Sequence, residues 1–362
     1  MMPWKLETLA IHAGRHPDPV TGSIATPIYP STTFLRGEAG NYPSGFSYSR
    51  EQNPNRKMLE ECLAALYEGK EALVFASGLA VVHAAFQSLQ TGDHVLATAD
   101  IYYGVRKVAG DVFPKWPLEI AYVDMTDLDA VRAAIRPSTR LIWTETPSNP
   151  LLKITDLAAI AEIARKANAI SICDNTFATP VYQRPFDSGI DMVMDSTTKY
   201  ISGHSDVVGG SLVTRYDNYL FERARKMQRF GGSVPSPFDC WLTLRGIETL
   251  PWRLRAMTAN AKLIVEFLLH HPAVEQVHYP GFSGMVSFQV KGGAKEAMDV
   301  TLRTRVFTRA TSIGGTHSLI EHRASVEGPG STTPENLLRM SVGLENHEDL
   351  IEDLAQALSA LE

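Results

Sequence analysis

Asp195-Ser196-Thr197-Thr198-Lys199-Tyr200 is the stretch that decides the fold of this 362-residue chain. It follows an apolar run at residues 190–194 and precedes a glycine-rich segment at residues 202–210. Upstream, residues 170–174 read Ile-Ser-Ile-Cys-Asp, the pattern of a buried strand that ends on a carboxylate. The pattern predicts strands of an open α/β sheet, and such sheets bind ligands beyond the carboxyl ends of their strands.

Lys199 and Asp174 are the candidate catalytic residues at these strand ends. A lysine amine can bond the aldehyde of pyridoxal phosphate, and a carboxylate can pair with the pyridinium nitrogen. The hydroxyls of Ser196 and Thr198, beside the lysine, can hold the phosphate. Taken singly, a surface lysine and an aspartate that caps a helix are the ordinary explanations. The position of both residues at the ends of successive strands favours the functional interpretation.

The composition limits the fold and excludes several function classes. A chain of 362 residues exceeds one hydrophobic core, so we expect two domains. The formal net charge of −6 offers no basic surface for nucleic acid or for anionic lipid, and we expect neither partner. Cys62, Cys173 and Cys240 are too few and too far apart for a disulfide framework, which fits the cytoplasm. We also expect no metal site, no secretory signal and no membrane span.

The order of apolar runs predicts a mostly parallel sheet with helices on both faces. Residues 1–55 are rich in proline, glycine, serine and threonine and are predicted to form an irregular arm. Helical patterns at residues 128–135 and 157–167 separate some of the expected strands. Those strands are predicted at residues 72–76, 94–97, 118–123, 141–144, 169–173 and 190–194.

The pattern changes after residue 213 and predicts a smaller α+β domain. Long helices are expected at residues 241–250 and 251–270, a half-buried strand at 285–290, and an amphipathic helix at 350–361. The predicted organisation is therefore an arm, a cofactor-binding domain and a C-terminal domain. Their predicted ranges are residues 1–55, 56–235 and 236–362.

Three further segments could bind anions. Gly78-Leu79 joins a strand to a helix, and is either an ordinary turn or a cradle of backbone N–H groups for a phosphate. Arg50 lies in the arm with Tyr48, and gains a role if the arm crosses to a neighbouring subunit. Arg339 lies inside an apolar run, where a buried guanidinium requires an anion. A substrate carboxylate and a structural salt bridge would serve Arg339 equally well.

Together these motifs resemble the pyridoxal-phosphate enzymes of cysteine and methionine metabolism, which include cystathionine γ-synthase, γ-lyase and β-lyase and methionine γ-lyase. The resemblance extends over nearly the whole chain. The motifs that carry it are Tyr48-Ser49-Arg50 with Asn53-Pro54, Ser77-Gly78-Leu79, Tyr102-Tyr103-Gly104, Glu145-Thr146-Pro147-Ser148-Asn149-Pro150, Asp174-Asn175-Thr176-Phe177, Ser196-Thr197-Thr198-Lys199-Tyr200, Pro235-Ser236-Pro237-Phe238-Asp239, Ser312-Ile313-Gly314-Gly315 and Arg339-Met340-Ser341-Val342-Gly343.

The resemblance implies a fold-type I subunit, similar to aspartate aminotransferase, in a homotetramer built from two dimers. It implies that Lys199 bonds the cofactor and later moves protons, that Asp174 pairs with the pyridine nitrogen, and that Tyr103 stacks on the ring. It assigns the phosphate to Gly78, Leu79, Ser196 and Thr198, joined by Tyr48 and Arg50 of a neighbouring subunit. It assigns the substrate carboxylate or a cofactor oxygen to Asn149, Ser312 and Arg339.

Several positions depart from the pattern of these enzymes. Ser47 and Thr311 are neutral where acidic residues are common, which weakens a site for the distal amino group of cystathionine. Val105 stands where methionine γ-lyase carries a cysteine. His317 replaces a usual glutamate, and Arg106 a small polar residue. After Gly281 the chain also lacks a segment that such enzymes carry.

The predicted function is a pyridoxal-phosphate-dependent carbon–sulfur lyase that acts on cystathionine or a related small sulfur amino acid. The alternative is cystathionine γ-synthase, which would replace the acyl group of an O-acylhomoserine. A fold-type I aminotransferase would share Lys199 and Asp174 and is a weaker alternative. A binding module without catalytic activity is the remaining class.

Overall fold

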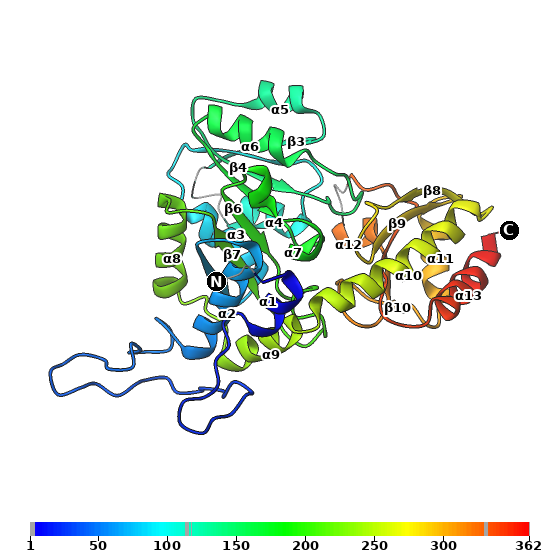
Figure 1. Ribbon diagram of the computed structural model, residues 1–362. Coiled ribbons are helices and arrows are strands. Elements are labelled where there is room, and N and C mark those ends of the chain that lie inside the picture. Colours follow the sequence, from blue (N-terminus) through cyan, green and yellow to red (C-terminus); the bar gives the residue numbers. More distant parts are fainter. Residues whose placement is uncertain (1–3, 113–115, 117, 329–331, 362) are drawn as a thin grey trace.

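The computed structural model describes residues 4–112, 116, 118–328 and 332–361. A large part contains a seven-stranded sheet, and a smaller part contains a five-stranded sheet (Figure 1). The helix α10 (Leu250–His270) runs from one part to the other. The predicted fold class, a mostly parallel sheet with helices on both faces and a smaller C-terminal α+β domain, is confirmed.

The large sheet is parallel except at one strand. Strand β7 runs antiparallel to both of its neighbours, and all other neighbouring pairs are parallel. Across the sheet the strands follow the order β1 (Glu71–Phe75), β7 (Gly210–Thr214), β6 (Met192–Asp195), β5 (Ile170–Asp174), β4 (Thr139–Glu145), β2 (His94–Thr98) and β3 (Glu119–Val123). Six of these strands lie within two residues of their predicted positions, but β7 was not predicted, because its serine and glycine obscure the apolar pattern.

Helices cover both faces of the large sheet (Figure 1). On one face, α3 (Gly78–Gln87) and α8 (Tyr219–Gly231) pack against side chains such as Phe75 and Leu212. On the other face, α5 (Leu128–Ala134) and α6 (Leu157–Lys166) pack against the alternate side chains. Apolar residues point to both faces of each central strand, which explains the nearly continuous apolar runs in the sequence.

Helices α2 (Pro54–Tyr67) and α9 (Pro237–Ile247) lie at the lower edge of the large part in Figure 1. Asn53 caps α2, and its side chain accepts the Asn55 N–H. Ser236 and Asp239 form a capping box that starts α9 four residues before the predicted start. Three other helices of the large part are short: α1 (Leu6–His12), α4 (Tyr103–Lys107) and α7 (Thr179–Tyr182). A π-helical turn (Val108–Val112) and a 3₁₀ turn (Pro185–Ser188) complete the large part.

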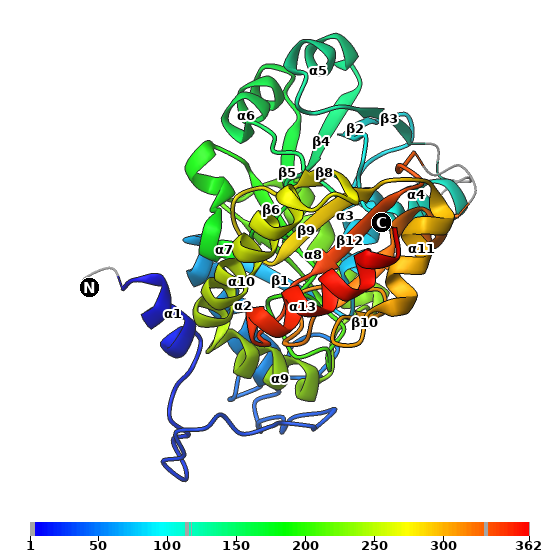
Figure 2. The same cartoon turned by 90° about the vertical axis from the view of Figure 1, so that its right-hand side faces the viewer.

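The smaller part stacks helices on one sheet (Figure 2). Its strands follow the order β10 (Thr308–Arg309), β11 (Leu319–His322), β12 (Leu337–Ser341), β9 (Met285–Val290) and β8 (Val274–His278). The end of α10 shares a core with α11 (Ala294–Arg303) and α13 (His347–Leu358). The short α12 (Arg323–Glu327) follows β11, and a 3₁₀ turn (Ser359–Leu361) follows α13. Residues 279–284 join β8 to β9, at the place where the sequence lacks a segment that similar enzymes carry.

The two halves of α10 pack into different apolar cores, which indicates where the boundary between the two parts lies. Cys240 and Leu244 of α9, with Leu254 and Met257 of α10, belong to the same apolar cluster as Leu63 of α2. Ala261, Ile264 and Leu268, further along α10, belong to the core of the small sheet. We therefore propose that the boundary lies inside α10, between Met257 and Ala261, and not at the expected residue 235.

Candidate active site

Three acidic residues end adjacent parallel strands, and two of them, Glu145 and Asp174, line a cavity. Glu145 ends β4, Asp174 ends β5 and Asp195 ends β6, and Glu145 is paired in register with Asp174. A cavity of about 270 Å³ lies at this edge of the sheet. Its lining includes Ser77, Gly78, Leu79, Tyr102, Glu145, Asn149, Asp174, Thr176, Ser196, Thr198, Lys199, Thr311, Ser312, Arg323 and Arg339. The structure therefore brings together nine of the twelve predicted site residues.

Lys199 lies on the turn that follows β6 and is half-buried. Its Nζ donates a hydrogen bond to the Ser312 hydroxyl at 2.9 Å. Burial, reinforced by the positive charge of Arg339, lowers the pKa of Lys199 to about 8. An ordinary lysine is fully charged near neutral pH, whereas this amine has an appreciable neutral fraction and can accept a proton.

Asp174 is a buried carboxylate that contacts no cation among the described residues. Its Oδ1 accepts the Thr176 N–H at 3.1 Å and the Thr176 hydroxyl at 2.6 Å. Burial raises the pKa of Asp174 and raises that of Glu145 further, because the two carboxyl groups repel each other. The Tyr102 N–H donates to Glu145 Oε2 at 2.8 Å. A cationic ring nitrogen beside Asp174 would restore its ionised form.

The opposite end of the cavity suits a small anion. Ser77 caps α3, and the following residues present the first N–H groups of this ten-residue helix. A Cβ added to Gly78 would lie 3.0 Å from the Ser196 Cβ, so any larger residue would push Ser196 out of place. The Thr198 hydroxyl donates to the Gly209 carbonyl at 3.1 Å and accepts the Gly209 N–H at 3.0 Å, which fixes the loop.

A buried ion cluster forms the wall contributed by the small part. Arg339 Nη1 donates to Asn149 Oδ1 at 2.8 Å, and its Nη2 pairs with Glu321. Burial, opposed by Glu321, lowers the pKa of Arg339 to about 10. Arg323 Nη1 contacts the same Glu321 oxygen at 3.1 Å. The Arg339–Glu321 pair is the structural salt bridge that was one of the two alternatives for Arg339. Arg339 also lines the cavity, where it could bind a substrate carboxylate.

Tyr102, and not the expected Tyr103, lines the cavity. Tyr102 precedes α4 and Tyr103 is its first residue; their rings meet edge to face, with centroids 5.1 Å apart, but only Tyr102 lines the cavity. Tyr103 faces an adjoining cavity, where the Arg323 guanidinium lies 5.4 Å from its ring centroid. We therefore propose Tyr102 as the residue that stacks on a bound ring. The sequence contained this signal in Tyr102-Tyr103-Gly104 but could not choose between the two tyrosines.

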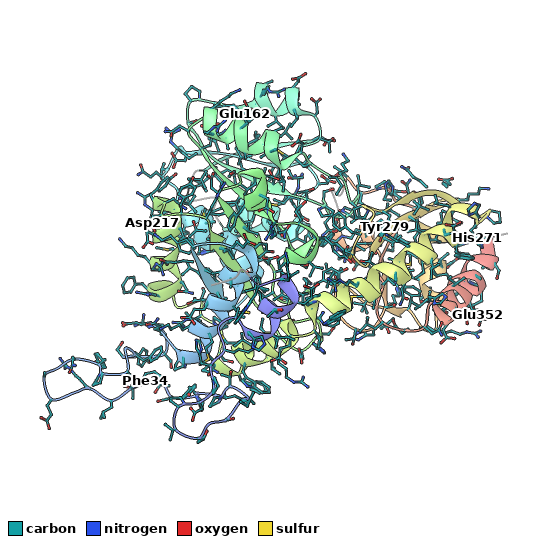
Figure 3. All side chains as sticks on the ribbon, viewed as in Figure 1. Phe34, Glu162, Asp217, His271, Tyr279 and Glu352 are labelled. Carbon is teal, nitrogen blue, oxygen red and sulfur yellow. The ribbon has the colours of Figure 1, made fainter. Side chains whose placement is uncertain are left out.

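Tyr48 and Arg50 lie outside the cavity of their own chain. Arg50 Nη1 donates to the Arg229 carbonyl at 2.5 Å, and its guanidinium lies 5.7 Å from the Tyr48 ring centroid. The arm extends away from both sheets, as the position of Phe34 in Figure 3 shows. Their predicted role in a neighbouring subunit stays a prediction.

Sequence reasoning did not select Glu145, Glu321, Arg323 or Thr176 as site residues. Glu321 and Arg323 offered the same signal that identified Arg339, which is a charged residue in or beside an apolar strand pattern. Within the described residues, no group of three or more His, Cys, Asp or Glu side chains could hold a metal ion. No helix in the described part of the chain is long and apolar enough to cross a bilayer.

The residues of this cavity fit pyridoxal phosphate. A lysine with a lowered pKa, a buried carboxylate with no cation beside it in the described part of the chain, and a glycine-lined anion cradle are arranged around one space. Asp174, Lys199 and α3 would hold the ring nitrogen, the aldehyde and the phosphate, respectively.

Known proteins similar to this chain carry the same chemistry. Residues 7–359 match a family described as Cys/Met metabolism PLP-dependent enzyme. Cystathionine gamma-synthase from Mycobacterium tuberculosis strain H37Rv is 46% identical over 97% of this chain and 96% of that protein. The crystal structure of metB from Corynebacterium glutamicum is 40% identical, with a TM-score of 0.96 over 99% of both chains. Cystathionine gamma-lyase from Lactobacillus plantarum, complexed with L-serine, is 36% identical with a TM-score of 0.93 over 99% of both chains.

Proposed function

Because the chain belongs to the family of pyridoxal-phosphate-dependent enzymes of cysteine and methionine metabolism, we propose that it is a carbon–sulfur lyase of transsulfuration. Its substrate would be cystathionine or a related small sulfur amino acid. The observation that carries this proposal is that Lys199, bonded to Ser312, lines one cavity with the buried carboxylate Asp174 and with Arg339. When bound, pyridoxal phosphate supplies an aldehyde that reacts with amines and a ring that withdraws electrons from the substrate α-carbon.

Lys199 would accept and return protons at its Nζ. Its lowered pKa supplies the neutral amine, and the Ser312 hydroxyl at 2.9 Å orients that amine. Ser312 has a φ of 99°, which is unusual for a residue other than glycine. This backbone conformation presents the hydroxyl to Lys199 and turns the Ser312 carbonyl toward Arg339 Nη2, 3.5 Å away.

Asp174 and Tyr102 would bind and orient the cofactor ring. A carboxylate beside the ring nitrogen stabilises the protonated, electron-withdrawing form of the ring. Burial raises the pKa of Tyr102, which keeps its phenol neutral and suits it to stack on an aromatic ring. Gly78, Leu79, Ser196 and Thr198 would hold the phosphate.

Arg339 and Asn149 would fix the substrate carboxylate. A guanidinium can bind a carboxylate through two parallel hydrogen bonds, which sets the orientation of the α-carbon as well as its position. The Nη1 bond to Asn149 holds the plane of the Arg339 guanidinium. With the carboxylate fixed, the α-proton can be directed toward Lys199.

Cystathionine γ-synthase is the second candidate. The relative at 46% identity, which bears that name, is the specific observation in its favour. Both reactions begin with removal of the α-proton, so Lys199, Asp174 and Arg339 would have the same roles in either. The neutral residues Ser47 and Thr311 also leave the distal ammonium group of cystathionine without an acidic partner at these two positions.

Product analysis separates the candidates. The holoenzyme is incubated with L-cystathionine, and pyruvate and 2-oxobutyrate are separated by chromatography. The lyase is supported if either keto acid forms at a rate proportional to enzyme concentration. If neither forms, while an O-acyl-L-homoserine and L-cysteine yield cystathionine, the synthase replaces the lyase. If no product forms in either assay and Lys199→Ala matches the unmodified protein, both candidates fail.

Two features of the structure support proposals about assembly and compartment. We propose a homotetramer in which Tyr48 and Arg50 reach the phosphate of a neighbouring subunit. Exposed apolar side chains on the arm, such as Val20, Ile24 and Leu35, support this proposal because they lack a core of their own. The three cysteines are buried free thiols, which supports a reducing compartment and hence the cytoplasm.

A further inference from the structure

Glu321 connects two buried arginines at the wall of the active-site cavity. Its Oε1 accepts from Nη2 of Arg339 and, at 3.1 Å, from Nη1 of Arg323. The exposed fractions of these side chains are 6% for Glu321, 5% for Arg339 and 1% for Arg323. The guanidinium that would bind the substrate carboxylate is therefore already paired with a carboxylate of the chain.

Among the residues that the structure describes, two buried atoms of this cluster have no hydrogen-bond partner. They are Arg323 Nη2 and Glu321 Oε2, and each belongs to one member of the same ion pair. A buried polar atom without a partner destabilises the folded protein, so an arrangement that leaves two of them needs an explanation. If Glu321 contacted Arg323 through both of its oxygens, both atoms would acquire partners.

We propose that Glu321 occupies the carboxylate-binding guanidinium of Arg339 in the absence of substrate, and that Arg323 receives Glu321 when a substrate carboxylate takes its place. Glu321 would move from Arg339 to a two-bond pair with Nη1 and Nη2 of Arg323. Arg323 is thus a positioning residue that acts through Glu321. The inference rests on the proposed function, because it requires a substrate carboxylate on Arg339.

The surroundings of Arg323 suit a fixed acceptor. Its Nε is held by Glu327 Oε1 at 3.0 Å, and its guanidinium lies 5.4 Å from the Tyr103 ring centroid. Glu327 thus contacts the Nε side of the Arg323 guanidinium, and Tyr103 faces the plane of the group. The edge formed by Nη1 and Nη2 remains available to Glu321. Arg339 meanwhile keeps Asn149 on its Nη1, so the exchange changes only the partner of Nη2.

Charge repulsion makes the exchange necessary. A substrate carboxylate that reached Arg339 with Glu321 still in place would put two negative charges within contact distance in a buried site. Transfer of Glu321 to Arg323 separates the carboxylates and leaves each with its own guanidinium. Arg323 should therefore affect how tightly a carboxylate binds, and have little effect on the chemical step.

The decisive variant is Arg323→Lys, because it retains the positive charge but cannot make the planar two-bond contact. It is compared with Glu321→Gln, the double variant, and Arg225→Lys as a control. Like Arg323, Arg225 pairs with two glutamates, but it is only partly buried and lies on α8, outside the cavity. The holoenzyme is used throughout. One readout is the Kd for pentanoate, an amine-free carboxylate, measured by calorimetry with pentanamide as the uncharged reference. The other is the separation of KM from kcat with the substrate that the unmodified enzyme uses.

We expect Arg323→Lys to raise the pentanoate Kd and the KM about tenfold and to leave kcat within about threefold. In the Glu321→Gln background the same change should have little effect, because no carboxylate remains to be received. Pentanamide binding and the control variant should not change. An Arg323→Lys variant that binds pentanoate as tightly as the unmodified enzyme overturns the inference, and this result does not require Glu321→Gln to fold. Additive effects in the double variant overturn it as well. If the unmodified enzyme turned over no substrate, while pentanoate binding still depended on Arg323 and Glu321 as expected, the proposed function alone would be refuted.

Discussion

Replacement of Lys199 by methionine should stabilise the cofactor-free protein at neutral pH, although it removes the residue proposed to move protons. Methionine has a similar length and no charge, so it fits the half-buried position of the lysine. Burial and the nearby Arg339 lower the pKa of Lys199 from 10.5 to about 8. The folded protein therefore holds an ammonium group that would be more stable in water.

The magnitude follows from the two pKa values. A difference of about 2.5 between them corresponds to about 3 kcal/mol, because each tenfold change in proton affinity is worth about 1.4 kcal/mol. Solvent screening of the partly exposed side chain reduces the expected gain to about 2 kcal/mol. Near neutral pH both the folded and the unfolded wild type bind the proton, so the whole effect is present. Between about pH 8 and about pH 10.5 only the unfolded state retains the proton, so the wild type gains stability and the advantage of the variant disappears.

The assay is urea denaturation of both proteins without cofactor, at one protein concentration, near pH 7 and again near pH 10.5. Lys262→Met is a suitable control because Lys262 is an exposed lysine on α10. The control should show no gain that depends on pH. A gain for Lys199→Met that is equal at both pH values, or absent at both, would refute the argument that burial of this charge destabilises the fold.

Substitutions at four other positions test the geometry of the site. Tyr102→Ala should weaken cofactor binding about tenfold in a fluorescence titration, because it removes a stacked ring. Tyr103→Ala should weaken cofactor binding far less. The opposite ranking would restore Tyr103 as the stacking residue. Gly78→Ala should lower cofactor affinity by at least about tenfold, because its Cβ would meet Ser196 at 3.0 Å. The circular dichroism spectrum should not change. Unchanged affinity would show that α3 does not hold the phosphate. Ser312→Ala and Ser312→Gly should shift the pH profile of kcat equally, but the glycine variant should be about 1 kcal/mol more stable to urea because glycine adopts a φ of 99° without strain. Equal stability of these two variants would contradict the assignment of backbone strain to Ser312.

Much of the fold could be predicted because local patterns agree with tertiary packing. Central strands such as β5 are buried on both faces, so their apolar runs are visible in the sequence. Strand β7 and helix α8 lacked such a signal. The first is rich in small residues, and the second has the charged outer surface of an amphipathic helix. The start of α9 was placed too late because the capping signal at Ser236 precedes its apolar residues.

The sequence by itself determined the chemistry at the end of β6: a lysine among hydroxyls, with an aspartate at the end of the preceding strand. These side chains were predictable because each follows a strand whose direction and edge are set by local apolar periodicity. Only the tertiary structure decided that Tyr102 faces the cavity, and that Glu321 bridges Arg323 and Arg339. Those facts depend on how a short helix and a second sheet are oriented against the first. That orientation arises from packing between residues more than 100 positions apart, which no local pattern encodes.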